Sequence, residues 1–151
     1  MSLAAILAAI PHRPPFLLLD EIVELSESRI LCRRTFTGDE FWYQGHYPDY
    51  PLTPGVLLCE AAMQAGAVLL SRQAGEAPEA VPVATRLGNV QFKQMVRPGD
   101  AIDVDVELVD RVANAFFLKG RITVGGKLAC RCEFACTMAP RPDGADPTPA
   151  N

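Results

Sequence analysis

The feature that most constrains the fold is a long apolar run at residues 55–74, which has no strong breaker inside it apart from one glycine. It begins directly after Pro54, and proline is well tolerated at a helix start. On a helical wheel the apolar side chains cover nearly every direction, which is typical of a helix buried on all sides. Glu60 and Gln64 interrupt the run, and its roughly sixteen apolar residues fall short of the ~20 that a membrane span needs. The run therefore predicts a buried helix at the centre of a globular domain.

The other patterned segments predict strands around this helix. Apolar or alternating runs, bounded by turn residues, are typical of strands. They lie at residues 16–25 and 29–37 before the helix, and at 81–96, 101–109, 115–124 and 127–138 after it. A short helix is predicted at residues 2–9, ended by Pro11. An antiparallel sheet wrapped around one apolar helix satisfies both kinds of element, so we expect an α+β fold. Such a sheet has edges, and pairing through an edge would make a dimer.

Length, charge and cysteine content limit the class of protein. The 151 residues, 49% of them apolar, fit a single domain, which we place at residues 1–139, with a disordered tail at 140–151. The net charge of -4, without a long run of one sign, argues against nucleic acid as the main partner. Five irregularly spaced cysteines without a secretory signal predict reduced thiols and a cytoplasmic location.

Glu60 is the residue whose position most indicates chemistry. It lies in the second turn of the apolar helix, and burying an ionised carboxylate is costly unless the group is paired or neutralised. Gln64 follows one turn later on the same face and can hydrogen-bond to it. A capping acid would belong in the first turn of the helix. We therefore interpret Glu60 as a functional acid that faces a cavity, is held in its neutral form, or both.

The long loop at residues 38–54 leads into the helix and is a second candidate for function. It carries His46, whose neutral imidazole suits a base near pH 7, although a loop histidine alone is more often an ordinary surface residue. Gly55 opens the helix, where unpaired N–H groups and the helix dipole favour negative charge. Two interpretations of Gly55 stand side by side: a simple helix start, or an oxyanion site for a thioester carbonyl.

These residues form one ordered motif that resembles a known family. The signature of the 3-hydroxyacyl-acyl-carrier-protein dehydratases of bacterial fatty-acid synthesis (the FabZ type) is similar to the run Gly45-His46-x-Pro48-x-x-Pro51-x-x-Pro54-Gly55-Val56-Leu57-x-x-Glu60-Ala61-x-x-Gln64. The family's opening resembles Ile10-Pro-His-Arg13 and the segment 15–20, and its second half resembles Phe92-Lys93 and the segment 96–100. The resemblance covers residues 10–138.

The resemblance implies a hot-dog fold and a homodimer with two active sites at the subunit interface. It is also compatible with a hexamer built as a trimer of dimers. It implies that His46 is the catalytic base and Glu60 the catalytic acid, supplied by opposite subunits. It further implies that the Gly55 N–H polarises the thioester carbonyl and that Gln64 orients Glu60. Val56 completes the substrate-binding set. A related bifunctional dehydratase–isomerase carries cysteine at that position and aspartate at position 60, so this chain resembles the plain dehydratase.

The implied reaction converts (3R)-hydroxyacyl thioesters on acyl carrier protein into trans-2-enoyl thioesters, with no metal or other cofactor. Tyr50 and Thr53 depart from the family pattern, and residues 81–90 match it poorly, which bears on acyl-chain length. Lys93 or Arg97 could steer an acidic carrier protein toward the site, since complementary charge guides encounter.

Other residues have plainer interpretations. His12 is interpreted as a structural turn histidine. Cys130, Cys132 and Cys136 fall on one strand face and are interpreted as buried thiols, not metal ligands, and Cys59 as core packing.

Three alternative functions stay open from the sequence. The first is a hydrolase of acyl thioesters on the same fold. The second is a non-catalytic acyl-binding or dimerisation module that kept the scaffold. The third is dehydration in a specialised lipid or polyketide pathway, which would use the same residues.

Overall fold

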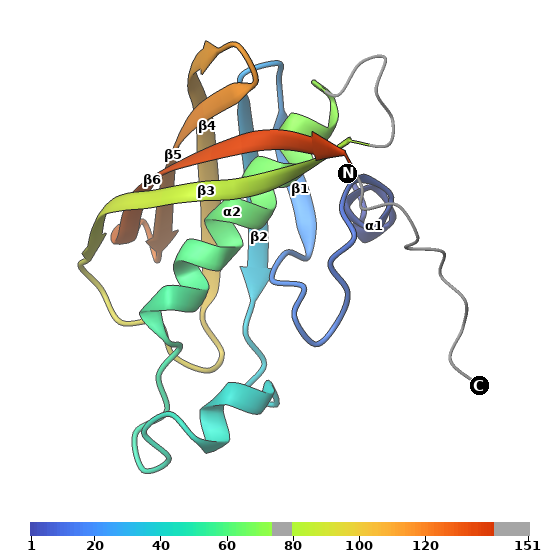
Figure 1. The fold of residues 1–151 in the computed structure, drawn as a ribbon. Coiled ribbons are helices and arrows are strands. Elements are labelled where there is room, and N and C mark those ends of the chain that lie inside the picture. Colours follow the sequence, from blue (N-terminus) through green and yellow to red (C-terminus); the bar gives the residue numbers. More distant parts are fainter. Residues whose placement is uncertain (74–79, 141–151) are drawn as a thin grey trace.

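In the computed structural model, which describes residues 1–73 and 80–140, a six-stranded sheet curves around one long helix (Figure 1). The elements follow in the order α1 (Leu3–Ala9), β1 (Glu21–Leu25), β2 (Arg29–Thr35), the 3-10 helix η1 (Phe41–Gln44), α2 (Gly55–Ser71), β3 (Ala80–Phe92), β4 (Ala101–Val112), β5 (Ala115–Val124) and β6 (Lys127–Pro140). The strands are arranged as β1-β2-β4-β5-β6-β3, and each neighbouring pair is antiparallel. The predicted α+β architecture is confirmed.

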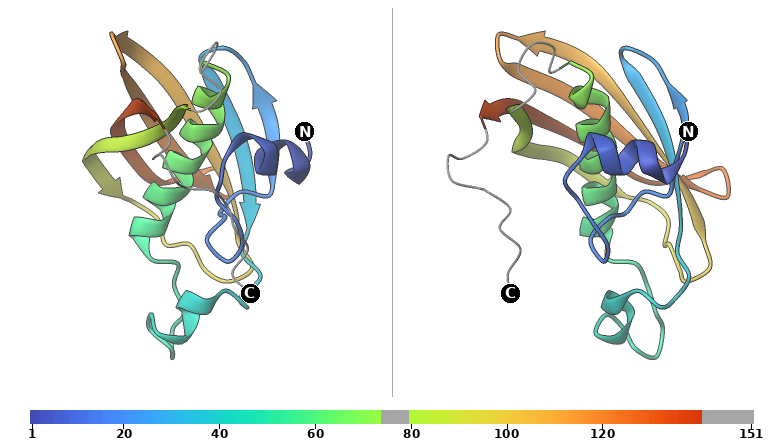
Figure 2. Two further views of the ribbon diagram at one scale, coloured as in Figure 1. Left: turned by 45° about the vertical axis from the view of Figure 1, so that its right-hand side comes forward. Right: turned by 90° about the vertical axis from the view of Figure 1, so that its right-hand side faces the viewer.

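The core lies between α2 and the curved sheet. The helix contacts strands β2 to β6, while α1 lies beside it near β1 (Figure 2). Two glycines allow the close approach of helix and sheet. A Cβ on Gly66 of α2 would lie 2.8 Å from Cζ of Phe134, and one on Gly120 of β5 would lie 2.9 Å from Cβ of Ala62. No heavier side chain fits at either position unless a neighbour moves.

One stripe of α2 is uncovered, so the prediction of a helix buried on all sides is wrong for that stripe. Val56 is 70% exposed, and Glu60, Met63 and Ala67 are partly exposed. These residues recur at spacings of three and four, which places them on one side of the helix. One curved sheet covers only part of a helix's circumference, so the remaining side is left open. No helix in the described ranges is both long and apolar enough to cross a membrane.

Strand β3 forms one edge of the sheet. Within the described part of the chain it pairs with β6 alone, although it is 13 residues long. Val83 and Leu87 are each 45% exposed, and Phe92 is 53% exposed. A long edge strand presents unpaired backbone N–H and C=O groups that can pair with another chain.

The predicted boundaries hold best where turn residues mark them. The strand at 115–124 is confirmed at both ends, whereas the strand predicted at 16–25 begins only at Glu21. The reason is a turn in which the Phe16 N–H donates to the Arg13 carbonyl, followed by buried residues 17–19 that run without ladder pairing. The predicted strand 81–96 ends at Phe92.

The ends of other elements shift less. Strand β6 continues to Pro140, and residues 141–151 of the predicted tail lie outside the described residues, as does residue 74 of the predicted helix.

The long loop 38–54 contains η1, which the sequence pattern did not predict. This loop is anchored at its far end, because the Thr53 N–H donates to the Val96 carbonyl at 2.8 Å and the Tyr43 and Thr53 hydroxyls lie 2.6 Å apart.

Candidate active site

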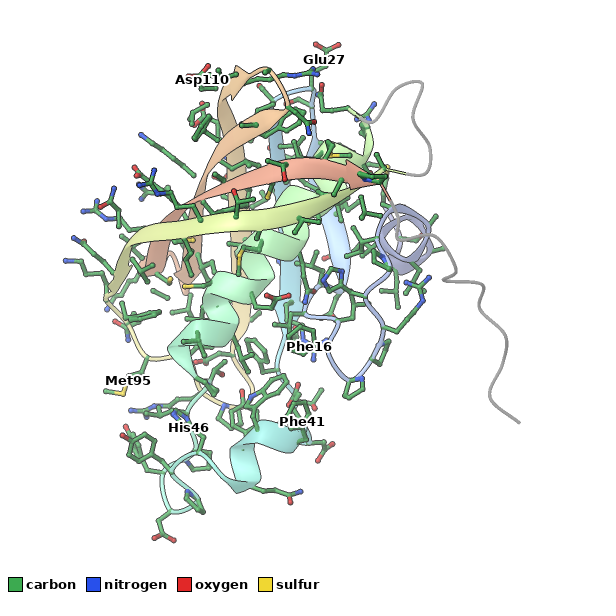
Figure 3. The ribbon with its side chains drawn as sticks, in the orientation of Figure 1. Phe16, Glu27, Phe41, His46, Met95 and Asp110 are labelled. Atoms are coloured by element: carbon green, nitrogen blue, oxygen red, sulfur yellow. The ribbon has the colours of Figure 1, made fainter. Side chains whose placement is uncertain are left out.

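A hollow of about 550 Å³ lies at the N-terminal end of α2. Its walls come from the loop before the helix, the first turn of the helix and the segment that follows β3. The lining residues are His46, Leu52, Thr53, Pro54, Gly55, Val56, Leu58, Phe92, Lys93, Gln94, Met95 and Val96. Figure 3 shows His46 on the loop below this end of the helix, and Met95 nearby on the connection between β3 and β4. Two other hollows, of about 470 and 750 Å³, lie over strands β3 to β6 and include neither His46 nor Glu60.

His46 is held by its own loop in a defined tautomer. Its Nδ1 lies 3.0 Å from the carbonyl oxygen of Leu52. A carbonyl oxygen can only accept, so Nδ1 carries the proton and Nε2 of the neutral ring has a free lone pair. The ring of Tyr47 packs edge-on against the imidazole, with ring centroids 4.8 Å apart. His46 is partly exposed in the hollow, so its Nε2 is available as a base.

The start of α2 offers backbone donors to the same hollow. Pro54 is the N-cap residue and makes no side-chain capping bond. The N–H groups of Gly55 and Val56 lie in the first turn, where the helix itself supplies no acceptor. The ring of Phe92 covers this turn closely, since a Cβ on Gly55 would lie 2.7 Å from Cε1 of that ring. A residue with a side chain at position 55 would therefore collide with the Phe92 ring unless that ring moved.

Glu60 lies one turn further along α2, with its side chain 21% exposed. Gln64 Nε2 donates to Glu60 Oε1 at 3.2 Å. The amide of Gln64 is itself fixed, because it accepts from the Leu18 N–H and donates to the Phe16 carbonyl, both at 2.8 Å. Gln64 is 1% exposed. A buried and fully oriented amide therefore holds one oxygen of Glu60, which leaves Oε2 available to a substrate.

Within the described residues of one chain, no hydrogen bond or ion pair joins His46 and Glu60, and Glu60 is not among the residues that line the His46 hollow. Glu60 is four positions after Val56, which lines the hollow, so it lies about one turn further along the helix.

The structure adds one residue that the sequence pattern did not assign to the site. His12 lies in the segment between α1 and β1, and its Nε2 is 3.7 Å from Glu60 Oε1. The sequence pattern predicts only a structural turn histidine at this position. No local signal could have found this contact, because the two residues meet only when the segment after α1 packs against α2.

The five cysteines are all free and buried, at 4% exposure or less. Burial raises the pKa of the Cys32 thiol to about 12 and that of the Cys136 thiol to about 11, so both stay protonated near neutral pH. The Sγ atoms of Cys59 and Cys130 lie 3.9 Å apart between helix and sheet. Across residues 1–73 and 80–140, no three His, Cys, Asp or Glu side chains are grouped so as to hold a metal ion.

Comparison with known proteins places this geometry in a family context. A family model, the FabA-like domain, matches residues 10–133. A 3-hydroxyacyl-[acyl-carrier-protein] dehydratase FabZ of Clostridium perfringens is 40% identical over 134 residues, which cover 89% of this chain and 96% of the relative. A protein of the same name from Petrotoga mobilis is 38% identical, over 89% of this chain and 95% of its own.

Solved structures share the fold at lower identity. A chain of the dehydratase heterocomplex ApeI:P from Xenorhabdus doucetiae has a TM-score of 0.76 and 18% identity, and the match covers 90% of this chain and 91% of that one. The TT0310 protein of Thermus thermophilus has a TM-score of 0.64 and 17% identity, over 85% of this chain and 100% of its own.

Proposed function

The chain belongs to the FabZ-type 3-hydroxyacyl-[acyl-carrier-protein] dehydratases of the FabA-like family, and on this premise we propose that it removes water from (3R)-hydroxyacyl thioesters on acyl carrier protein to give trans-2-enoyl thioesters in fatty-acid synthesis. The observation that carries the proposal is the fixed tautomer of His46. Its Nδ1–H donates to the Leu52 carbonyl, so Nε2 keeps a free lone pair, and the residue lines the hollow at the start of α2.

The mechanism assigns one step to each group. The thioester carbonyl accepts a hydrogen bond from the Gly55 N–H, which stabilises the enolate-like charge that develops on it. His46 Nε2 removes a proton from C2 of the acyl chain. Glu60, as the carboxylic acid, donates its proton to the hydroxyl on C3, and water leaves. Because Oε1 accepts from Gln64, the proton is on Oε2, the oxygen that remains free. Val56 lies next to Gly55 in the lining of the hollow, and we assign it to the substrate-binding residues.

A homodimer brings the two groups together. Two copies that pair along β3 about a two-fold axis would place these edge strands antiparallel. The end of β3 that flanks the His46 hollow in one copy would then lie toward the start of β3 in its partner. The exposed apolar residues of β3 and the exposed stripe of α2 that carries Glu60 are surfaces that such a dimer could cover. Each active site would combine His46 of one subunit with the partner subunit's Glu60.

We expect carrier-protein substrates to depend on two basic residues near the hollow. Lys93 lines it, and the guanidinium of Arg97 stacks on the Tyr50 ring, 4.6 Å from the ring centroid. Both side chains are exposed. Changing both to glutamate should lower kcat/KM for a carrier-bound substrate by about tenfold or more at low salt, because complementary charge speeds encounter. The same variant should process a small pantetheine thioester at close to the wild-type rate.

The matched control for this measurement is a double glutamate substitution of Arg121 and Arg131. These exposed residues lie opposite each other on β5 and β6, so the charge change is the same while the site is different. An equal loss on carrier-bound and small substrates, or an equal loss in the control, would count against carrier docking at Lys93 and Arg97.

The experiment that tests the proposed function measures hydration and hydrolysis of one thioester at the same time. Purified protein is incubated with a trans-2-enoyl thioester, while the absorbance of the conjugated thioester and the release of free thiol are recorded together. Dehydratase activity, measured in the hydration direction, should reduce the absorbance and form the 3-hydroxyacyl thioester without free thiol. Release of thiol would support a hydrolase, and no reaction with any chain length on a carrier protein would support a binding module.

We also propose a cytoplasmic location, which the five free cysteines support.

A further inference from the structure

We propose that His12 is a positioning residue for Glu60, an inference that rests on the proposed function. Its Nε2 lies 3.7 Å from Glu60 Oε1, the same oxygen that accepts from Gln64 Nε2 at 3.2 Å. The imidazole side chain is 28% exposed and the carboxylate side chain 21%, so the contact is partly shielded from water. Two N–H groups from different segments would then hold one oxygen of the catalytic acid.

The surroundings of the imidazole indicate which of its two nitrogens carries the proton. His12 Nδ1 is buried and has no hydrogen-bond partner among the described residues. A proton on Nδ1 would bury an unpaired N–H and turn the Nε2 lone pair toward the oxygen of Glu60. A proton on Nε2 leaves Nδ1 as a buried acceptor but directs an N–H at the carboxyl group, so the close pair of atoms is attractive. The separation of 3.7 Å is longer than a formed hydrogen bond, and such contacts commonly tighten when substrate binds.

The backbone that carries His12 is tied in place. The Arg13 guanidinium donates to three carbonyls, those of Leu7 at 2.9 Å, Ile10 at 2.8 Å and His12 itself at 2.7 Å. These three hydrogen bonds fix the backbone where α1 ends. On the other side of His12, the same segment binds Gln64 through the Phe16 carbonyl and the Leu18 N–H. The segment therefore positions both donors to Glu60, one directly and one through an amide.

The chemical consequence concerns the second oxygen of Glu60. With Oε1 occupied by two N–H donors, the acid proton stays on Oε2 and the carboxyl plane is fixed. Removing the His12 donor leaves Gln64 as the one remaining side chain among the described residues that holds Oε1, so the carboxyl group can rotate away from the substrate hydroxyl. The loss should appear in kcat, since the acid acts in the chemical step, and KM should change little.

Two amide substitutions separate this role from simple packing. In His12→Gln the amide nitrogen is as many bonds from Cα as Nε2 is, so its N–H can reach Glu60. In His12→Asn the amide nitrogen is at the level of Nδ1 and falls short. We expect the Asn variant to lose about tenfold to 100-fold in kcat, part of the ~10²–10⁴-fold that a positioned acid or base contributes, and the Gln variant to recover most of it.

The control is Glu60→Gln, assayed beside both variants in the dehydration of a 3-hydroxyacyl thioester, with circular dichroism to verify folding. Equal kcat in the Gln and Asn variants, or an effect on KM alone, would overturn the positioning role while leaving the function intact. Full activity of Glu60→Gln would overturn the proposed function instead. If the Asn variant does not fold, His12→Phe keeps a planar ring without an N–H donor, and wild-type kcat in that variant would also overturn the role.

Discussion

Replacing His46 by asparagine is expected to lower kcat for dehydration by about 10²–10⁴-fold, which is the usual contribution of a positioned base. The asparagine amide is at the level of Nδ1, so its N–H can still donate to the Leu52 carbonyl and keep the loop in place. What it lacks is a basic atom at the position of Nε2. The variant therefore removes the base and leaves the contact that shapes the loop.

The measurement is steady-state dehydration of a 3-hydroxyacyl thioester, with thermal unfolding as the check on structure. A matched control is Tyr47→Phe, which removes a hydroxyl group beside His46 and keeps the ring that packs against the imidazole. Its activity should stay near that of wild type. If the His46→Asn enzyme retained roughly a tenth or more of wild-type kcat, another group would have to be the base.

Mixing two inactive variants is expected to restore activity. Glu60→Gln keeps an acceptor oxygen for Gln64 but cannot donate an acid proton to a leaving hydroxyl, so it should be nearly inactive alone. In a heterodimer of this variant with His46→Asn, one site holds both changes and the other holds neither. A random mixture of equal amounts contains half heterodimers, so activity should rise to about a quarter of wild type, provided that the dimer has two-fold symmetry.

Co-expression with two different affinity tags yields the pure heterodimer, which should reach about half of wild-type activity by the same reasoning. Each variant carrying both tags, expressed alone, is the control and should stay inactive. A purified heterodimer without activity would contradict a site shared between subunits. It would require His46 and Glu60 to meet within one chain, although no contact joins them in the described residues.

Several elements could be predicted because local pattern and turn chemistry agree. The helix Gly55–Ser71 follows Pro54 and keeps an apolar run, so its existence and start are determined locally. The hairpin of β5 and β6 turns at Gly125 and Gly126, both of which have positive φ, as glycine readily allows. At residues 16–19 the local pattern predicts a strand, but the structure has irregular chain there. A buried apolar run looks the same whether it pairs in a ladder or packs as irregular chain, and here Gln64 supplies the hydrogen bonds.

The sequence by itself determined the kinds of chemistry present: a histidine in a proline-rich loop, an acid in an apolar helix, and the motif that joins them. Tertiary structure decided which groups meet. Within the described residues of one chain no hydrogen bond or ion pair joins His46 and Glu60, although the two are near in sequence. The packing of the segment after α1 onto α2 brings His12 to Glu60 from far away in the chain. Neither outcome is visible in sequence, because contacts between distant segments depend on how elements pack and not on the local pattern of side chains.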